Sequence, residues 1–304
     1  MKYEELKAKV CAGIVLYNPD IAVLKKNIDA LYQQVDTIIL IDNASENIDE
    51  VYSLVDKYRN IIVQKNAENY GIAKALNQLL DFAYKKGYEW FLTMDQDSRC
   101  SNNLIFEYAK YMPEDSRVAV LCPFVLNNNK ITFEEYKKLN LCTVENVLDP
   151  IDCITSGSLN RTSSALKIRG YYDKLFIDCV DVDFNIRLFK DNFKIIRVNS
   201  AFMFQSMGDA KKVILFDLIY RVTGSKLLKK LRYTPVYSDL RLYYIARNSS
   251  IIWQKYGAKA GKRMTPSWMK KQFVYYLLTY PITRNRIAMI KSINKGLQDG
   301  REFV

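Results

Sequence analysis

Two aspartates separated by one residue are the part of this chain best suited to chemistry. Asp95 and Asp97 follow an apolar run at residues 90–94 that is typical of a buried strand. On an extended backbone, residues i and i+2 point the same way, so the two carboxylates can converge on one hard divalent cation. A pair of solvated turn aspartates is the other interpretation of so short a motif. The secondary-structure elements expected around the motif decide between these two interpretations.

Strands and helices alternate along the first half of the sequence. Apolar runs that indicate buried strands occupy residues 10–17, 37–41, 61–63 and 90–94. Helical spacing of apolar residues marks residues 21–34, 48–58 and 71–86. Buried strands that alternate with amphipathic helices form a sheet whose two faces are both covered. We therefore expect an α/β fold with a mostly parallel central sheet flanked by helices.

Polar side chains follow each of these four strands. They are Asn18 and Asp20, then Asp42, Asn43 and Ser45, then residues 66–71, and finally Asp95 and Asp97. In an open parallel sheet, ligands bind beyond the carboxyl ends of the strands. Helix caps and turns can explain the single groups, but they explain the paired acids poorly. The chain has neither common glycine-rich phosphate loop, so a bound diphosphate needs a metal, and Asp95 and Asp97 can hold one.

The basic charge of the chain is concentrated in its last third. Of 304 residues, 49% are apolar and 26% are charged, as in ordinary globular proteins, and the net charge is +12. Residues 211–304 alone carry 20 basic and four acidic side chains, a net charge of +16, whereas residues 1–210 carry −4. This asymmetry predicts an acidic partner for the last third, such as a membrane surface, a nucleic acid or a phosphate-bearing substrate. A basic face that only aids solubility is the alternative.

The cysteine and histidine content limits the kinds of reaction that the protein could catalyse. The six cysteines are scattered, form no C-x-x-C motif and stand mainly among apolar residues, which indicates buried thiols in a reducing compartment. The chain has no histidine, so acid–base chemistry must fall to carboxylates. The first residues lack the apolar core of a signal peptide, and no apolar run reaches the roughly 18 residues that span a bilayer. We therefore expect a soluble or peripheral protein in the cytoplasm.

Six short segments occur in a characteristic order between residue 10 and about residue 209. They are residues 12–19 (AGIVLYNP), 41–45 (IDNAS), 69–77 (NYGIAKALN), 94–97 (MDQD), 155–159 (TSGSL) and 176–187 (FIDCVDVDFNIR). In this order they resemble the family 2 glycosyltransferases of the GT-A fold, and most closely the bacterial rhamnosyltransferase-like branch. Residues 241–248 resemble the C-terminal part of the same family.

The resemblance implies a donor site at the strand ends. The residues that would contact the nucleotide or sugar of the donor are Asn18, Asp42, Asn69, Gly71, Lys74 and Asp95. Asp97 and Asp95 would hold Mg²⁺ or Mn²⁺ on the diphosphate, because both cations take oxygen ligands. The residues expected on the acceptor side are Ser156, Gly157, Asp178 and Asp183.

The same resemblance makes Asp181 the catalytic base. It would take the proton from the acceptor hydroxyl while that oxygen attacks the anomeric carbon, in a single inverting displacement. The metal would stabilise the departing nucleoside diphosphate. Asp178 is the alternative base. Because Asp183 and Arg187 stand at i and i+4 of an expected helix, an ion pair between them is also expected.

Two positions depart from the family pattern. Val180 stands where many relatives have a glutamate directly before the base. Gln205 stands where many have a histidine that completes the metal shell, and an amide oxygen is a weaker ligand for a transition metal. We therefore expect Gln205 to join Asp95 and Asp97 at a metal site of reduced affinity. If the acids do not assemble, a non-catalytic nucleotide-sugar-binding relative is the alternative.

These features predict an enzyme of two regions. Residues 1–210 would form the GT-A catalytic domain, and residues 211–304 a basic, aromatic-rich helical region on the membrane and acceptor side. The expected reaction moves L-rhamnose from dTDP-rhamnose to a lipid-linked saccharide in bacterial surface polysaccharide synthesis. A UDP-linked galactose, glucose or N-acetylhexosamine is the alternative donor.

The order of apolar, aromatic and basic side chains in residues 211–304 indicates which partner this region binds. Apolar and aromatic side chains mixed with lysine and arginine at residues 213–222 and 268–280 suit an anionic membrane surface, here the inner face of the plasma membrane. Helices that pack on the catalytic domain are the alternative. No recognised nucleic-acid motif is present, so nucleic acid is not an expected partner. A nucleotidyltransferase would be expected to carry a glycine-rich loop with a basic residue after the first strand, which residues 18–20 do not provide.

Overall fold

The computed structural model describes residues 2–112, 114–127, 131–205, 210–225, 231–281 and 283–303. The chain divides into two compact units. Unit 1 comprises Met1–Val125, Asn140–Phe176 and Val180–Gln205, and unit 2 comprises Leu126–Leu139, Ile177–Cys179 and Ser206–Val304. Two short segments from the first 210 residues therefore group with the C-terminal part of the chain.

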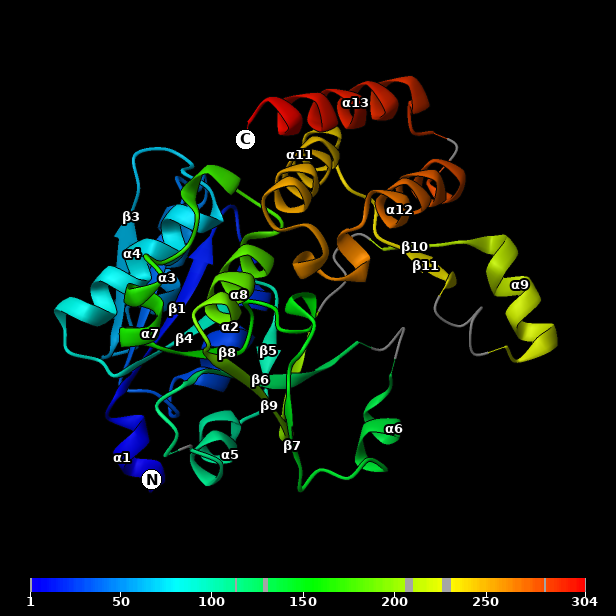
Figure 1. Cartoon of the computed structure of the whole chain (residues 1–304). Coiled ribbons are helices and arrows are strands. Elements are labelled where there is room, and N and C mark those ends of the chain that lie inside the picture. The colour runs from blue at the N-terminus through cyan, green and yellow to red at the C-terminus, as the bar shows by residue number, and fades with distance from the viewer. Residues whose placement is uncertain are drawn as a thin grey trace. The chain divides into compact units, whose positions relative to one another are not determined.

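Four parallel strands form one half of the sheet in unit 1 (Figure 1). They lie in the spatial order β3-β2-β1-β4. Their bounds are β1 (Val10–Leu16), β2 (Thr37–Asp42), β3 (Ile61–Lys65) and β4 (Trp90–Asp95). Each strand begins at the residue expected from its apolar run and ends within two residues of the expected end. For β1, β2 and β4 the agreement arises because parallel strands covered on both faces are apolar along almost their whole length, whereas β3, at the edge of the sheet, is only partly buried.

The other half of the sheet is antiparallel. β8 (Ser158–Arg161) pairs with β4 and with β6 (Val118–Leu126). β9 (Lys194–Phe204) pairs with β5 (Arg99–Cys100) and with β7 (Val144–Asn146). The sheet as a whole is mixed, so the expectation of a mostly parallel sheet holds only for the first four strands. The exposed strand β7 leaves no apolar run by which the sequence could reveal it.

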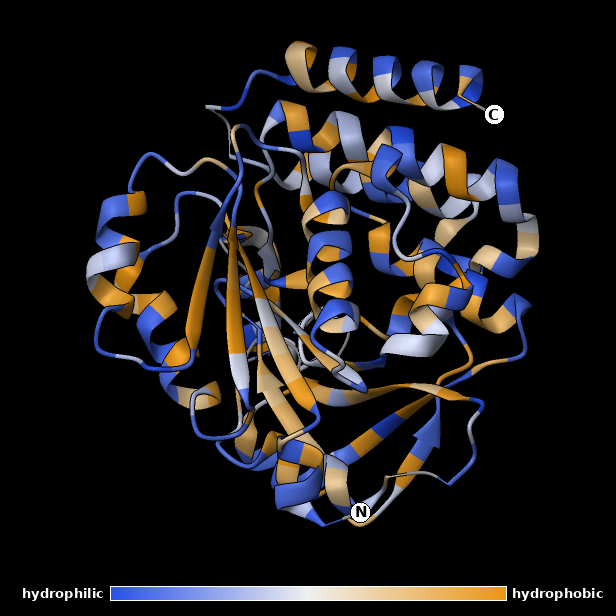
Figure 2. Cartoon of the chain, turned by 90° about the vertical axis from the view of Figure 1, so that its left-hand side faces the viewer, coloured by the Kyte–Doolittle hydropathy of each residue, from blue (hydrophilic) through white to orange (hydrophobic). Residues whose placement is uncertain are grey.

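Helices cover both faces of the parallel half. Ile14 of β1 packs with Leu24 and Ile28 of α2 (Ile21–Leu31) in one core cluster, to which α3 (Ile48–Val55) also contributes. Gly13 of β1 instead faces Leu79 of α4 (Ile72–Lys85). Because neighbouring residues of a strand point to opposite faces, α4 covers the face opposite to α2. Figure 2 shows the resulting arrangement of apolar strands among helices with mixed surfaces.

Shorter elements complete unit 1. The helices are α1 (Tyr3–Lys7), α5 (Leu104–Lys110), α7 (Thr162–Lys167) and α8 (Val180–Lys190), with single turns η1 (Pro150–Asp152) and η2 (Asp173–Leu175). Four cysteines, Cys11, Cys100, Cys122 and Cys153, are buried as expected. Cys142 is exposed, which corrects the expectation for that thiol, because it lies in the polar segment before β7.

Three helices form the core of unit 2. They are α11 (Asp239–Tyr256), α12 (Pro266–Thr279) and α13 (Arg286–Glu302), which bury Leu242, Phe273 and Met289 in one cluster. Each begins at a capping side chain, Ser238, Thr265 and Asn285 respectively, that accepts a backbone N–H of the first turn. None of the described helices is both long enough and apolar enough to cross a membrane.

The smaller elements of unit 2 lie outside this helical core. They are α6 (Phe133–Lys137), β10 (Lys211–Lys212), α9 (Ile214–Thr223), β11 (Tyr233–Thr234), η3 (Gly257–Ala260) and η4 (Lys262–Met264). β10 and β11 form a two-stranded antiparallel sheet.

Candidate functional site

The carboxyl ends of the parallel strands bring two predicted carboxylates to one edge of the sheet. The register pairs Leu16 of β1 with Asp42 of β2, and Val15 of β1 with Asp95 of β4. Neighbouring strands lie about 4.8 Å apart, so the Cα atoms of Asp42 and Asp95 are roughly 10 Å apart across the end of β1. This is a suitable spacing for residues that contact different parts of one donor molecule.

The backbone of Asp95 is held from two sides. Asn27 of α2 donates from Nδ2 to the Asp95 carbonyl at 2.8 Å, and the Asp95 N–H donates to Ser156 Oγ at 3.1 Å. Gln96 pairs with the backbone of Tyr17, accepting its N–H at 2.8 Å and donating to its carbonyl at 3.1 Å. The end of β4 is thus tied to the end of β1. Sequence reasoning missed Asn27 and Gln96, and nothing in the local pattern marks them.

A second set of contacts fixes the loop after β2. Asp42 is fully buried, and its carboxylate accepts the Ser45 N–H at 3.1 and 3.3 Å. Ser45 Oγ accepts the Asn18 N–H at 2.9 Å, and Asn18 Oδ1 accepts the Glu46 N–H at 2.8 Å. The helix-cap and turn interpretation therefore accounts for Ser45, while Asn18 joins the loops after β1 and β2.

Buried amides connect the ends of β2 and β3 with α4. Asn66 Nδ2 donates to Asn43 Oδ1 at 2.9 Å, and Asn66 and Gln78 exchange hydrogen bonds of 2.7 and 3.0 Å. Asn43 also donates to the Gly71 carbonyl at 3.3 Å. Asn69 Oδ1 accepts the Gly71 N–H at 2.9 Å, a turn that leads into α4. These contacts hold the loop between β3 and α4 in place at the carboxyl ends of the parallel strands.

Gly71 permits a close approach of backbone at the start of α4. Its φ is +83°, and a Cβ there would lie 2.5 Å from the Phe176 ring and 2.7 Å from the Phe176 carbonyl. That carbonyl accepts the N–H groups of Ile72 at 2.7 Å and Ala73 at 3.4 Å. The approaching backbone is therefore that of Phe176, which caps the helix. Lys74, one turn further on, lies 3.5 Å from Asp173, and both side chains are about half exposed.

Asp181 lies in the first turn of α8. Its side chain is partly exposed, and Oδ1 accepts the Val182 N–H at 2.8 Å. A carboxylate at a helix N-terminus is stabilised by the helix dipole, which favours its ionised form. This is the form that a general base requires.

The rest of α8 is anchored in unit 1. Asp183 is fully buried and accepts Arg187 Nε at 2.7 Å, so the expected ion pair is present. Phe184 stacks on Tyr171 with ring centroids 4.3 Å apart, and burial raises the pKa of the Tyr171 hydroxyl. Asn185 donates to two carbonyls at 2.7 Å. Since its carboxylate is buried and paired, Asp183 helps to hold α8 in the fold, and the acceptor-side role expected from the sequence stays a prediction.

The other residues expected on the acceptor side also serve the fold. Ser156 is fully buried and holds Asp95. Gly157 has a φ of +78°, and its carbonyl accepts the buried Tyr108 hydroxyl at 2.7 Å. Asp178 belongs to unit 2 and pairs with Arg241, at 3.1 Å from Oδ1 and 3.3 Å from Oδ2. Asp178 therefore serves as the ion-pair partner of Arg241.

Gln205 directly follows β9, and β9 pairs with β5, the short strand that comes soon after the paired aspartates. β5 and β9 pair Arg99 with Phe204, so continuing this register by one residue sets Gln205 opposite Ser98, the neighbour of Asp97. Asp95 is partly exposed and Asp97 is exposed. In the part of the chain that the structure describes, no three acidic, cysteine or histidine residues gather as a metal site. A cation there would rely on two carboxylates and an amide oxygen, a donor set that suits Mg²⁺ or Mn²⁺ completed by diphosphate oxygens.

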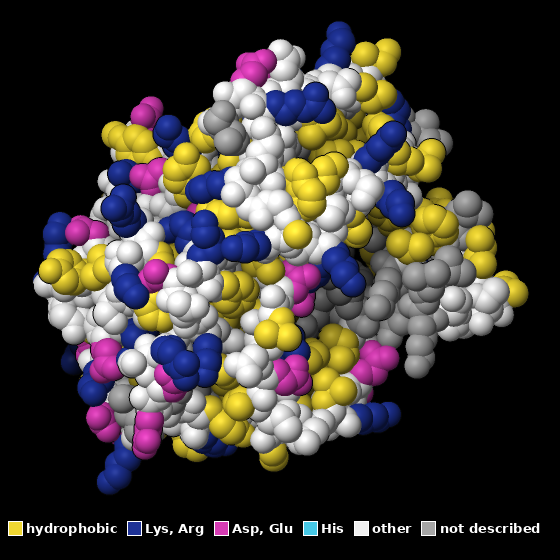
Figure 3. All heavy atoms as spheres, in the orientation of Figure 1, with side chains coloured by type: hydrophobic (Ala, Val, Ile, Leu, Met, Phe, Trp, Pro, Cys, Tyr) yellow, Lys and Arg dark blue, Asp and Glu magenta, His cyan; other side chains and the backbone are white. Residues whose placement is uncertain are grey.

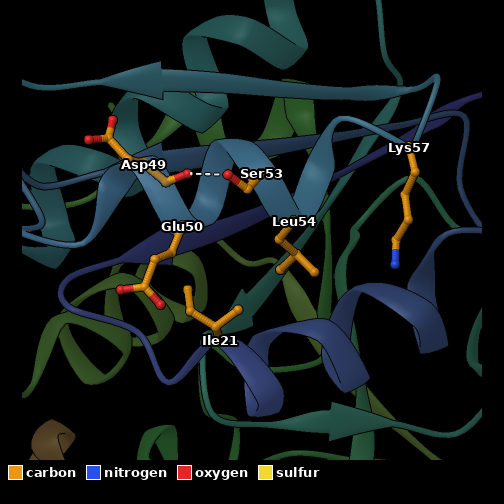
Figure 4. Close-up of a pocket in the computed structure, with 6 residues that line it drawn as sticks. All are labelled: Ile21, Asp49, Glu50, Ser53, Leu54 and Lys57. Carbon is orange, nitrogen blue, oxygen red and sulfur yellow. Dashed lines mark hydrogen bonds between the residues drawn. The ribbon is translucent and has the colours of Figure 1, made fainter.

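A shallow hollow lies elsewhere, between α2 and α3 (Figure 4). Its lining residues are Ile21, Asp49, Glu50, Ser53, Leu54 and Lys57, and Ser53 Oγ donates to the Asp49 carbonyl at 2.9 Å. None of the predicted donor, metal or acceptor residues is among them. The hollow is therefore not part of the candidate site at the strand ends.

The amino-acid sequence of this chain is similar to those of known proteins. The pattern of the family described as Glycosyl transferase family 2 matches residues 11–180, more than half of the chain. The dTDP-rhamnosyl transferase RfbF of Shigella flexneri is 24% identical over 261 residues, which cover 82% of this chain and 81% of that protein.

Two solved structures share the fold. GalNAc-T7, crystallised with UDP, GalNAc and Mn²⁺, has a TM-score of 0.55 and 12% identity, over 98% of this chain and 56% of that one. TarS 1-349 of S. aureus has a TM-score of 0.51 and 12% identity, over 97% of this chain and 92% of that one. This chain thus spans about half the length of the GalNAc-T7 chain, and at such low identity the likeness concerns the fold alone. The expected GT-A fold is confirmed, and the match over residues 11–180 shows that the chain belongs to glycosyltransferase family 2.

Proposed function

We propose that this protein is an inverting glycosyltransferase that moves one sugar from a nucleoside diphosphate donor to an acceptor hydroxyl. One observation supports this above the others. Asp42 and Asp95 lie on either side of the end of β1, and α8 of the same unit carries Asp181 in its first turn. The proposal divides the chain into a catalytic domain at residues 1–210 and an acceptor-side and membrane-side region at residues 211–304.

Asp181 acts as the base in this proposal. It accepts the proton of the acceptor hydroxyl while the oxygen forms a bond to the anomeric carbon. The bond from that carbon to the diphosphate breaks, and the diphosphate leaves with the electron pair. Attack from the face opposite the leaving group inverts the anomeric carbon, so one carboxylate suffices and no histidine is needed.

The donor would lie along the edge formed by Asn18, Asp42, Asn69, Gly71 and Asp95. The Lys74–Asp173 pair is half exposed, and such pairs contribute little stability, so Lys74 can turn towards a phosphate at small cost. Mg²⁺ or Mn²⁺ held by Asp95, Asp97 and Gln205 would neutralise charge on the leaving diphosphate. The neutral amide of Gln205 predicts weaker metal binding than a histidine or carboxylate would give.

The sugar we propose is L-rhamnose from dTDP-rhamnose, and the acceptor a lipid-linked saccharide of a bacterial surface polysaccharide. The support is the similarity to a protein named as a dTDP-rhamnosyl transferase. UDP-linked hexoses are the alternative donors, and the test below distinguishes the two.

Calorimetric titration with dTDP and with UDP, each with and without Mn²⁺, tests the donor site. We expect dTDP to bind more tightly than UDP, and Mn²⁺ to strengthen the binding. Asp97→Asn should remove the metal-dependent part of the binding, whereas Asp181→Asn should bind dTDP like the unaltered protein. Tighter binding of UDP would assign a UDP-sugar donor, and a folded protein that binds neither nucleotide would overturn the proposal.

Transfer itself tests the base. Release of dTDP from dTDP-rhamnose, measured with a bacterial lipid extract as acceptor, should stop in Asp181→Asn. Intact release by the folded Asp181→Asn protein would show that another group is the base.

An amphipathic helix supports a membrane location for the acceptor. Ile214, Leu218 and Val222 form a stripe on α9, with 71%, 56% and 87% of their surfaces exposed. Beside them the buried Asp217 is surrounded by Lys212, Arg221 and Arg232, a cluster of net positive charge. Lysine and arginine also outnumber acidic side chains around α12 and α13 in Figure 3. An apolar stripe flanked by cations fits the inner, anionic leaflet of the plasma membrane.

Cosedimentation with vesicles tests this location. We expect binding to vesicles that contain phosphatidylglycerol, and little binding to pure phosphatidylcholine. Leu218→Glu should weaken the binding, whereas Leu148→Glu, which alters an apolar residue of unit 1 that is 86% exposed, should not. Equal binding of both variants would exclude α9 as the membrane contact.

A further inference from the structure

The paired aspartates lie on a tight turn. β4 ends at Asp95, and the Ser98 N–H donates to the Asp95 carbonyl at 3.3 Å, which closes a turn over residues 95–98. Asp97 is the third residue of this turn, so it does not continue the strand. The direction of the Asp97 side chain relative to Asp95 is therefore set by the turn, and not by the alternation of side chains along an extended backbone.

The first residue of the turn is held by two buried side chains of unit 1. Asn27 of α2 donates from Nδ2 to the Asp95 carbonyl at 2.8 Å, and Ser156 Oγ accepts the Asp95 N–H at 3.1 Å. Both Asn27 and Ser156 are fully buried. These two contacts act on Asp95, where the chain leaves β4.

The middle of the turn is held by the side chain of Gln96. Its Oε1 accepts the Tyr17 N–H at 2.8 Å, and its Nε2 donates to the Tyr17 carbonyl at 3.1 Å. Val15 is the last residue of β1 that pairs with β4, and Tyr17, two residues on, faces the same side. There the chain after β4 has turned away. The Gln96 amide therefore supplies to Tyr17 the partner that strand backbone supplies to Val15.

The chemistry of the Gln96 amide suits this place. A glutamine carries an acceptor oxygen and a donor NH₂ group side by side, as a strand backbone does. A carboxylate could only accept and an ammonium group could only donate, so neither could pair with both the N–H and the carbonyl of one residue. Gln96 thus binds the end of β1 through both of its polar groups.

The position of Gln96 in the sequence links this contact to the metal. Asp97 directly follows Gln96 and precedes the buried Ser98. We propose that Gln96 is a positioning residue for the divalent cation: by binding the turn to the end of β1, it fixes the direction in which the Asp97 carboxylate points. The inference rests on the proposed role of Asp95 and Asp97 as ligands of Mg²⁺ or Mn²⁺. The turn, β1 and β4 all belong to unit 1.

Gln96→Met tests this role, because methionine has nearly the same length but cannot make the two hydrogen bonds. Gln96 is partly exposed, so the variant should fold. Changing a residue that orients metal ligands typically costs 10- to 100-fold in metal affinity. In calorimetric titrations with dTDP, we therefore expect the Mn²⁺ concentration for the half-maximal effect on binding to rise by about 10- to 100-fold.

Two comparisons show whether the effect is confined to the metal. The Kd for dTDP without Mn²⁺ should stay unchanged in Gln96→Met, because Asp42, Asn69 and Gly71 lie on other loops. Gln33→Met, which alters an exposed glutamine just after α2, is the matched control and should change neither quantity. A loss of dTDP affinity without Mn²⁺ that equals the loss with Mn²⁺ would contradict the positioning role.

A double variant tests whether Gln96 acts through Asp97. If it does, Gln96→Met combined with Asp97→Asn should bind dTDP in the presence of Mn²⁺ as Asp97→Asn alone does, because the ligand that Gln96 orients is already lost. A further loss in the double variant would show that Gln96 contributes independently, and would overturn the inference.

Hydrogen exchange supplies a readout that needs no metal. The Tyr17 amide should exchange faster in Gln96→Met than in the unaltered protein, because it loses its acceptor. The Asn43 amide donates to the Leu16 carbonyl at 2.9 Å, on the other side of β1, and should keep its protection as an internal control. Unchanged exchange at Tyr17 would show that Gln96 does not hold the end of β1, and the inference would fall.

Asp97→Asn, measured alongside, separates this inference from the proposed metal site. If Mn²⁺ does not strengthen dTDP binding to the unaltered protein, the proposed metal site is wrong and the inference falls with it. If Asp97→Asn removes the effect of Mn²⁺ while Gln96→Met keeps the Mn²⁺ requirement of the unaltered protein, the metal site stands and the positioning role falls.

Discussion

At the scale of single residues, the candidate site depends on side chains that fix backbone as much as on those that face a ligand. Ser156 and Asn27 hold Asp95, and Gln96 ties its loop to Tyr17. Gly71 leaves room for Phe176. Each of these contacts joins residues that are far apart in the sequence. A substitution at such a position acts on the geometry of the edge and on stability together.

Gly71→Ala should destabilise the protein strongly. The alanine would have to adopt a φ of +83° and place its Cβ 2.5 Å from Phe176, so we expect a loss of about 3 kcal/mol or more in the free energy of unfolding. Gly87→Ala is the control, because Gly87 has a φ of +77° but nothing within 4 Å of its Cβ position. That change should cost about 1 kcal/mol. Urea denaturation measures both, and equal losses would contradict the packing argument.

Asp183→Ala should reveal a structural role for this buried carboxylate. It would leave Arg187, which is 19% exposed, without its ion-pair partner, and we expect a loss of about 3 kcal/mol. Asp81→Ala breaks a pair of the same i, i+4 spacing with Lys85, but both side chains are more than half exposed. That loss should stay below about 0.5 kcal/mol. Thermal unfolding of the two variants compares them, and similar midpoints would contradict the assignment.

At the scale of elements, α9 combines an exposed apolar stripe with a buried acid. Burial alone would raise the pKa of Asp217, but hydrogen bonds from Arg232 and Lys212 and the charge of Arg221 outweigh it, so the pKa is lowered. Asp217 thereby connects α9 to Lys212 of β10 and to Arg232, the residue directly before β11. The helix can then keep its apolar stripe facing outwards.

The stability of this region should fall in acid. The pKa of Asp217 is lower in the folded protein than the value of about 3.9 in an unfolded chain. The folded state therefore gains stability above pH 4, and loses it as the pH falls through the folded pKa. Asp217→Asn should lower stability at pH 7 and flatten the decline between pH 5 and pH 2.5. Urea denaturation at pH 7 and pH 3 checks this, and an unchanged pH dependence in Asp217→Asn would assign the decline to other carboxylates.

At the scale of the whole molecule, burial divides the six thiols into classes. Burial raises the pKa of Cys11 and of Cys100 to about 12, and Cys122 and Cys153 are also buried. Cys142 is exposed and Cys179 is partly exposed. The folded protein should therefore present very few reactive thiols.

A thiol-specific reagent at pH 8 should distinguish these classes. We expect Cys142 to react first, Cys179 more slowly, and the other four only on unfolding, because these four are buried. A thiolate is the reactive form, and a pKa of about 12 suppresses it further at Cys11 and Cys100. Mass spectrometry of the labelled protein assigns the sites. Rapid labelling of Cys11 or Cys100 in the folded protein would contradict the buried core of unit 1.

Much of the first half of this protein follows from local sequence. The apolar runs place β1, β2, β3 and β4 within two residues, and for β1, β2 and β4 the reason is that a strand covered on both faces is apolar along almost its whole length. The rule that ligands bind at carboxyl strand ends then selects Asp42 and Asp95, and the register brings both to the end of β1. The i, i+4 spacing likewise predicts the Asp183–Arg187 pair.

Tertiary structure alone decided which polar residues hold the backbone of distant segments. Asn27 reaches Asp95 across 68 residues of sequence, Gln96 reaches Tyr17 across 79, and Asn248 reaches Asp178 across 70. It also made half of the sheet antiparallel and buried Ser156, Gly157 and Asp183. The physical reason is that hydrophobic periodicity is a property of neighbouring residues, whereas a hydrogen-bond partner is chosen only when packing brings distant segments together.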